Sequence, residues 1–169
     1  MKMRDATEIQ KLREMPSSQQ MELRARNVVA DLLIKSLLVP KIFFDARWTS
    51  RDTPDVLAID RSGTGDVHVV EIKTGVPSAK VAIPGLLSVP ANFRWIAILL
   101  KRGERVPRAF RDSLAPERGA GRVGIIGITS DRNDILSAQI EVSAERFPGA
   151  LYEKADRFKD RRKADIEFR

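Results

Sequence analysis

The sequence predicts an α/β domain in which helices flank a mixed central β-sheet. Apolar residues recur at helical spacing from Gln19 to Leu38, which predicts one long amphipathic helix. Two short β-branched runs, Val56–Ile59 and Val67–Ile72, are separated by turn-forming residues and predict an antiparallel hairpin. The apolar run from Phe93 to Leu100, interrupted by Arg94, is typical of a strand buried on both faces, as parallel strands are.

Length and composition indicate one ordinary globular domain. The chain has 169 residues, of which 43% are hydrophobic and 31% charged, and this is enough to bury one sizeable core. No internal repeat or low-complexity segment indicates a second domain. We divide the chain into an N-terminal arm over residues 1–16, an α/β domain over 17–143 and a basic, charged C-terminal helix or tail over 144–169.

The elements before the hairpin are bounded by polar caps and prolines. Residues 1–16 are polar and end at a proline, which predicts a loose arm. Ser17 or Ser18 suits the helix N-cap, and Pro40 ends the helix. The aromatic-rich, weakly alternating segment from Lys41 to Trp48 predicts the first strand.

The elements after the hairpin are predicted from apolar runs and from prolines and glycines. Residues 79–89 are apolar but contain Pro84-Gly85, so any helix there is expected to be short or split. A helix is predicted from Pro107 to Leu114. Strands are predicted from Val123 to Thr129 and from Leu136 to Val142, the second at an edge or in a hairpin with the first.

Two further segments carry weaker signals. Residues 144–169 carry charges of both signs and predict a partly helical, solvated tail, which alternatively extends a DNA-binding surface. Gly119, Gly121 and Gly124 have the spacing of a dinucleotide-binding loop. They lead into a predicted strand instead of opening a helix, so we expect no such loop.

Net charge and residue composition limit the kinds of molecule and metal ion that the protein could bind. The net charge of +7 favours nucleic acid or an anionic membrane. The absence of cysteine and the single histidine make a zinc site improbable and leave oxygen ligands for any metal. The apolar runs are too short to span a bilayer, and the N-terminus has no apolar signal segment, so we expect a cytoplasmic protein.

The hairpin concentrates charged groups in apolar surroundings. Because side chains alternate along a strand, Glu71 and Lys73 share one face while Val70 and Ile72 take the other. Folding the first strand back places Asp55 opposite Glu71 or Ile72, where paired residues lie roughly 5 Å apart. Two carboxylates and a lysine are therefore expected to converge at one end of the hairpin.

A divalent cation explains this convergence, because neighbouring carboxylates repel each other unless a cation offsets their charge. Mg²⁺ prefers oxygen ligands, and Asp55, Glu71 and the carbonyl of Ile72 suit it. Such a cation activates water and neutralises phosphoryl charge, and Lys73 would orient the nucleophile or stabilise the transition state. The predicted reaction is hydrolysis of a phosphodiester bond.

These residues resemble the PD-(D/E)XK nuclease superfamily, which has the restriction-endonuclease-like fold and includes Holliday junction resolvases. The resemblance rests on Pro54-Asp55, on Glu71-Ile72-Lys73 in the next strand and on Glu22 in the preceding helix, within Ser17–Gly75. It implies a Mg²⁺- or Mn²⁺-dependent nuclease with Asp55, Glu71, Lys73 and Glu22 as site residues. It also implies DNA as substrate and a 5′-phosphate product.

Each of these assignments has a purely structural alternative. Glu22 lies four residues before Arg26, so an exposed ion pair explains it equally well. Arg47 and Arg51, just before Asp55, would contact phosphates at the rim of the site or stay solvated.

Three more residues near the site have expected roles in DNA contact or in packing. Lys80 is a further candidate for the DNA backbone. We expect Trp48 to pack in the core or at the rim, and His68 to be a packed histidine on the face opposite Glu71.

The sequence thus predicts a metal-dependent DNA endonuclease. The alternatives are an inactive nucleic-acid-binding module on the same fold and a domain that binds a protein partner. A homodimer is a further expectation, because cutting both strands of a duplex favours two sites related by a twofold axis.

Overall fold

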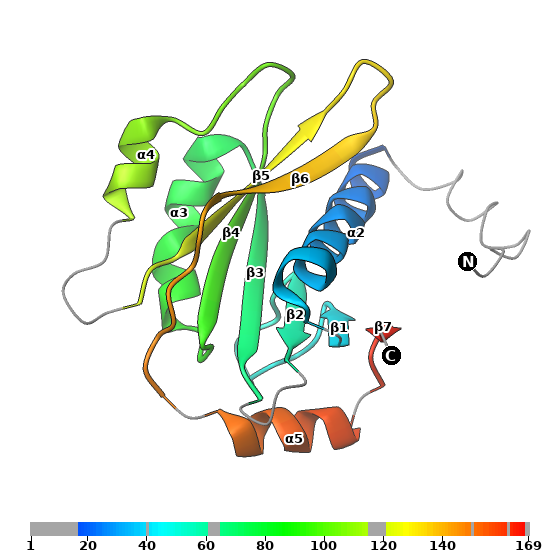
Figure 1. Cartoon of the computed structure of the whole chain (residues 1–169), viewed down its shortest axis with the longest axis vertical. Helices are drawn as coiled ribbons and strands as arrows, with labels where there is room; N and C mark the ends of the chain where they lie inside the picture. Colours follow the sequence, from blue (N-terminus) through cyan, green and yellow to red (C-terminus); the bar gives the residue numbers. More distant parts are fainter. Residues whose placement is uncertain are drawn as a thin grey trace, which may run out of the picture.

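Seven strands form one curled, mixed β-sheet in the order β6-β5-β4-β3-β2-β1-β7 (Figure 1). The structure is a computed structural model, and it describes residues 17–39, 41–60, 65–114, 121–149, 151–161 and 163–167. The elements in these ranges are α2 (Ser17–Leu37), β1 (Lys41–Phe44), β2 (Val56–Ile59), β3 (Val67–Thr74), α3 (Gly75–Ser88), β4 (Phe93–Leu99), α4 (Arg108–Ser113), β5 (Gly124–Ser130), β6 (Leu136–Val142), α5 (Tyr152–Arg161) and β7 (Ile166–Glu167).

The strand directions confirm the predicted α/β class with a mixed sheet. β3, β4 and β5 are parallel neighbours, whereas β1, β2, β6 and β7 each pair antiparallel with their neighbours. The parallel strands lie at the centre, where helices cover both faces of the sheet. β4 accordingly buries its residues from Trp95 to Ile98 on both sides, as its apolar run predicts.

Two hydrophobic cores lie on the two faces of the sheet. On one face, Ala25, Val29, Ala30 and Leu33 of α2 pack with strand residues that include Trp95. On the other face, α3, α4 and α5 pack against the alternate residues of the same strands. Figure 1 shows α2 on one side of the sheet and α3 with α4 on the other.

The predicted hairpin is confirmed, and its register decides where the charged groups go. Val56 pairs with Val70, so the next position along each strand brings Asp55 opposite Glu71. Val70 and Ile72 belong to the core under α2, which leaves Glu71 and Lys73 on the face that carries α3. Residues 61–64 of the connecting turn lie outside the described residues.

Two predicted boundaries are wrong. The helix expected to be short or split is continuous over α3 and contains Pro84. Burial of Val76, Ala79 and Leu86 against the sheet outweighs the local cost of a proline inside a helix. The first strand ends at Phe44 instead of continuing to Trp48, because Asp45 has a left-handed backbone (φ 46°) that a strand cannot accommodate.

The C-terminal segment is helical, as predicted, but it is not a solvated tail. Ala155 of α5 is fully buried. The Phe158 ring meets the Phe43 ring edge-on at 4.9 Å between centroids and the Trp48 ring at 5.5 Å. β7 then pairs with β1 and extends the sheet. This segment therefore belongs to the core of the described domain.

Residues 1–16, the predicted N-terminal arm, lie outside the described residues. In the ranges that are described, no helix combines the length and the apolar character needed to cross a membrane.

Two glycines allow a matched test of the packing. A Cβ on Gly124 would lie 2.3 Å from the Trp95 ring, whereas a Cβ on Gly85, inside α3, meets nothing within 4 Å. We expect Gly124→Ala to lower the free energy of unfolding by about 1–3 kcal/mol through overpacking. Gly85→Ala should raise it by about 0.5–1 kcal/mol through helix propensity. Urea unfolding measures both, and equal effects would contradict the close approach at Gly124.

Candidate functional site

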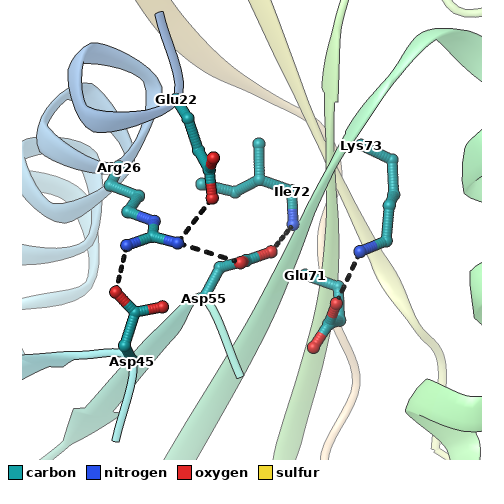
Figure 2. A network of polar contacts seen from close by, with 7 residues as sticks. All are labelled: Glu22, Arg26, Asp45, Asp55, Glu71, Ile72 and Lys73. Atoms are coloured by element: carbon teal, nitrogen blue, oxygen red, sulfur yellow. Dashed lines mark hydrogen bonds and ion pairs between the residues drawn. The ribbon is translucent and has the colours of Figure 1, made fainter. Parts of the chain in front are cut away.

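A hydrogen bond across the two strands fixes Asp55 at the end of the hairpin that lies away from its turn. Its Oδ2 accepts a 2.7 Å hydrogen bond from the backbone N–H of Ile72. Its Oδ1 lies 3.4 Å from a guanidinium nitrogen of Arg26 on α2. Figure 2 shows the carboxylate between these two partners. Asp55 lies one residue before β2, so its position depends on this hydrogen bond to β3.

Glu71 and Lys73 form an ion pair on the α3 face of β3. The Lys73 ammonium donates a 2.8 Å hydrogen bond to the Glu71 carboxylate. Their side chains are 23% and 31% exposed, so neither is free in bulk solvent. The predicted shared face of these two residues is thus confirmed.

Glu71 and Lys73 line an open cavity of ≈ 740 Å³ between β3, α3 and the loop before β2. The loop contributes Arg51, Asp52 and Thr53. The opposite wall is made by Ser78, Val81, Ala82, Gly85, Leu86, Ser88 and Val89. The described lining therefore combines charged side chains with a partly apolar wall.

Burial and neighbouring charges shift the pKa of Glu71 and of Lys73. Burial raises the pKa of Glu71, and the charges of Asp55 and Asp52 raise it further, although the hydrogen bond from Lys73 lowers it. Burial alone would lower the pKa of Lys73. The hydrogen bond and charge of Glu71, with the charges of Asp55 and Glu22, outweigh burial and raise it. Lys73 is therefore a stable ammonium at neutral pH.

The residues present fit a hard divalent cation. Asp55 and Glu71 offer carboxylate oxygens close enough for the charge of one to raise the pKa of the other. A cation between them would relieve that repulsion. No cluster of three or more His, Cys, Asp or Glu side chains suited to a metal occurs among the described residues. The residues that would hold a cation are the predicted ones, Asp55, Glu71 and the carbonyl of Ile72, and Mg²⁺ usually takes few protein ligands.

Arg26 connects the acidic residues on the α2 side, and sequence reasoning did not assign it this role. It binds Glu22 at 2.6 Å, contacts Asp45 and approaches Asp55, while its own side chain is only 14% exposed. Burial would lower the pKa of Arg26, but the hydrogen bond to Asp45 and the charges of all three acids raise it. The sequence indicated only its pairing with Glu22, because nothing local links α2 to Asp45 or Asp55.

Glu22 forms the ion pair that the structural alternative predicts, and its side chain is 51% exposed. It reaches the site indirectly, because the same Arg26 nitrogen contacts Glu22 and Asp55 (Figure 2).

The candidate phosphate contacts lie at different places. Arg51 lines the cavity, as the rim assignment predicts. Arg47 is exposed and donates a hydrogen bond to the backbone of Ser50. Lys80 is exposed on α3 but does not line the cavity. Asp52, which no sequence pattern singled out, faces the same cavity as Glu71.

Trp48 and His68 have the packing roles that were predicted. Trp48 is buried and its indole N–H donates to the carbonyl of Pro90 at 2.7 Å. His68 stacks on Phe93 and accepts a hydrogen bond from Trp95 at 3.3 Å. Burial lowers the pKa of His68 to about 4, so the imidazole is neutral at pH 7.

Comparison with known proteins yields a structural likeness. No protein-family model matches the chain, and no curated protein matches it. Among solved structures, the SPO1766 protein of unknown function from Silicibacter pomeroyi is similar, with a TM-score of 0.51 and 16% sequence identity. The likeness covers 80% of this chain and 78% of that one. At this identity it supports the arrangement of helices and strands alone.

The opposing influences on Glu71 predict opposite effects of two substitutions. Lys73→Met should raise the pKa of Glu71 further, because burial and the charges of Asp55 and Asp52 remain while the lysine is lost. Asp52→Asn should lower the same pKa, because it removes one of the charges that raise it. A ¹³C NMR titration of the Glu71 carboxyl carbon measures both. Shifts in the same direction would contradict this balance.

The shift also predicts how stability depends on pH. The folded-state pKa of Glu71 lies above its unfolded value, so the folded state binds the proton more tightly. The contribution of Glu71 to the free energy of unfolding therefore falls as pH rises between the two values. In Lys73→Met this fall should become larger than in the unmodified protein. Urea unfolding on either side of that interval checks the sign.

Proposed function

We propose that this protein is a Mg²⁺- or Mn²⁺-dependent DNA endonuclease of the PD-(D/E)XK superfamily, with a restriction-endonuclease-like fold. One observation carries the proposal. Asp55 is hydrogen-bonded to the backbone of Ile72 across a hairpin, while Glu71 and Lys73, on either side of Ile72, face an open cavity. The proposal is supported by the nearness of Asp55 to Ile72, although Asp55 is not among the described residues that line the cavity.

In this proposal Asp55 and Glu71 would hold the cation. A bound Mg²⁺ or Mn²⁺ supplies activation of water and neutralisation of phosphoryl charge. Lys73 keeps its proton at neutral pH because its pKa is raised. Its role is therefore that of a positive charge and hydrogen-bond donor that orients the nucleophile or a phosphate oxygen, not that of a general base.

The residues around the cavity support a polyanionic substrate. Arg51 lies at the rim, and Arg47 and Lys80 offer further exposed cations. The net charge of +7 attracts nucleic acid to the whole chain. Cutting both strands of a duplex would use two copies related by a twofold axis. Glu22 is assigned a supporting role through Arg26, which it shares with Asp55.

One observation favours a second candidate function, a nucleic-acid-binding module without turnover. Each acid of the motif already has a cationic partner, Arg26 for Asp55 and Lys73 for Glu71. A cation has to compete with or displace these partners. If their attraction is stronger, the protein binds DNA but does not cut it.

Cleavage assays test the first candidate. We expect plasmid, branched or single-stranded DNA to be cut with Mg²⁺ or Mn²⁺ and left intact with EDTA. Glu71→Gln and Lys73→Met should each reduce the rate by about a hundredfold or more, the scale of removing one group that stabilises the transition state. Lys35→Met is the matched control, because Lys35 is an exposed lysine that pairs with Asp31 on α2.

The outcomes separate the candidates. Equal cleavage by both site variants and the control would indicate a contaminant and contradict the catalytic assignment. DNA binding without cleavage favours the second candidate. Calorimetric titration with Mn²⁺ adds an independent measurement, in which Asp55→Asn should abolish binding of the cation. A protein that binds neither DNA nor Mn²⁺ would contradict both candidates and favour a protein-partner domain.

A further inference from the structure

A second cavity, of ≈ 550 Å³, lies away from the candidate site, between α4, the segment before β5 and β6. Three arginines line it, Arg108 and Arg111 from α4 and Arg122 from the segment before β5. Asp112, Glu141 and Val142 complete the described lining. We call this the arginine cavity. It shares no described residue with the cavity that Glu71 and Lys73 line.

The guanidinium groups of the arginine cavity are incompletely paired. Arg108 contacts Asp112 at 3.5 Å, and Arg122 contacts Glu145 at 3.0 Å. Within the part of the chain that the structure describes, the Arg111 side chain has no hydrogen-bond or ion-pair partner. The Nε atoms of Arg111 and Arg122 are both buried without a partner. Buried donors without acceptors are costly, so an anion that supplies acceptor oxygens would stabilise this cavity.

The chemistry of the lining favours a phosphate group with one negative charge. A planar guanidinium with several donors matches phosphate oxygens, which it can bind in pairs. The lining holds three arginines and two carboxylates, and Glu145 pairs with Arg122 beside it, so the positive and negative charges of these described residues balance. Because no excess positive charge remains, a phosphodiester with one negative charge suits the cavity better than a phosphate monoester, which carries nearly two charges.

The arginine cavity lies on the same face of the sheet as the candidate site. Phe110 of α4 packs in the same core as Val76 and Leu86 of α3. Figure 1 shows α4 beside α3. A polynucleotide that reaches Glu71 and Lys73 over this face can therefore continue towards α4.

We propose that the arginine cavity binds a backbone phosphate of the nucleic acid, remote from the bond that is cut. The choice of nucleic acid rests on the proposed function. Arg111 is the central donor, because its guanidinium is partly buried and uncommitted. The cavity anchors the strand and contributes affinity without touching the reacting atoms.

Metal-free DNA binding tests this inference separately from catalysis. Fluorescence anisotropy with a labelled duplex in EDTA gives the affinity of the unmodified protein, of Arg111→Gln and of the control Arg132→Gln. Both substitutions remove one positive charge, but Arg132 is exposed and does not line the cavity. We expect Arg111→Gln to weaken binding by about five- to tenfold and to reduce the slope of log affinity against log salt by about 0.9. The control should stay within about twofold.

Two further measurements guard against indirect effects. Arg111→Lys keeps the charge but loses the planar fork, so it should bind with intermediate affinity if the folded cavity is intact. Calorimetry with inorganic phosphate and a nucleoside monophosphate tests a free ligand as the source of the phosphate. Tight binding of either one that depends on Arg111, with DNA affinity unchanged, would overturn the assignment to a polynucleotide.

The result is distinguishable from failure of the proposed catalysis. If Arg111→Gln and Arg132→Gln have equal effects in a protein that cuts DNA, the inference fails and the endonuclease proposal stands. If DNA binding depends on Arg111 in a protein that never cuts, the inference stands and the catalytic proposal fails. Absence of DNA binding at any salt concentration overturns both.

Discussion

The pairing of β2 with β3 is the constraint on which the candidate site depends. With Val56 opposite Val70, Val70 and Ile72 enter the core under α2, and Glu71 and Lys73 face α3. A slip of one residue would exchange these faces and bury both charges of Glu71 and Lys73 under α2. Burial of β3 thus determines which side chains reach the cavity. The hydrogen bond from Ile72 to Asp55 continues the same pairing by one position.

Charge balance at the site comes from both sides of the sheet. Arg26 approaches Asp55 from α2, and Lys73 holds Glu71 on the α3 side. Asp55 also acts on Glu71, because its charge contributes to the raised pKa of Glu71. Any divalent cation therefore enters an arrangement that is already neutralised in part. The affinity for a divalent cation depends on how easily it displaces Arg26 from Asp55 and Lys73 from Glu71. Arg26 is therefore as relevant to the proposed chemistry as the residues of the motif.

Local sequence patterns predicted much of the sheet, but not the contacts between distant segments. Alternation and apolar runs identified the hairpin, β4 and β6, since each depends on burial of its own residues. The continuity of α3 through Pro84 depends on packing energy that no local rule contains. The Arg26 contacts and the arginine cavity unite residues separated by tens of positions. The docking of α5 had a readable signal, because Leu151, Ala155 and Phe158 recur at helical spacing.

The distribution of charge bears on the proposed function, which requires the attraction of both a phosphate and a divalent cation. The chain is basic overall, with a net charge of +7, yet Asp52, Asp55 and Glu71 raise the local negative charge beside the main cavity. A uniformly basic surface would attract a polyanion but repel a divalent cation. Carboxylates beside the cavity attract a cation although the chain as a whole is basic, because each charge is felt most strongly within about one Debye length, roughly 8–10 Å at moderate salt. On the same face of the sheet, the arginine cavity adds the guanidinium of Arg111, which has no partner among the described residues.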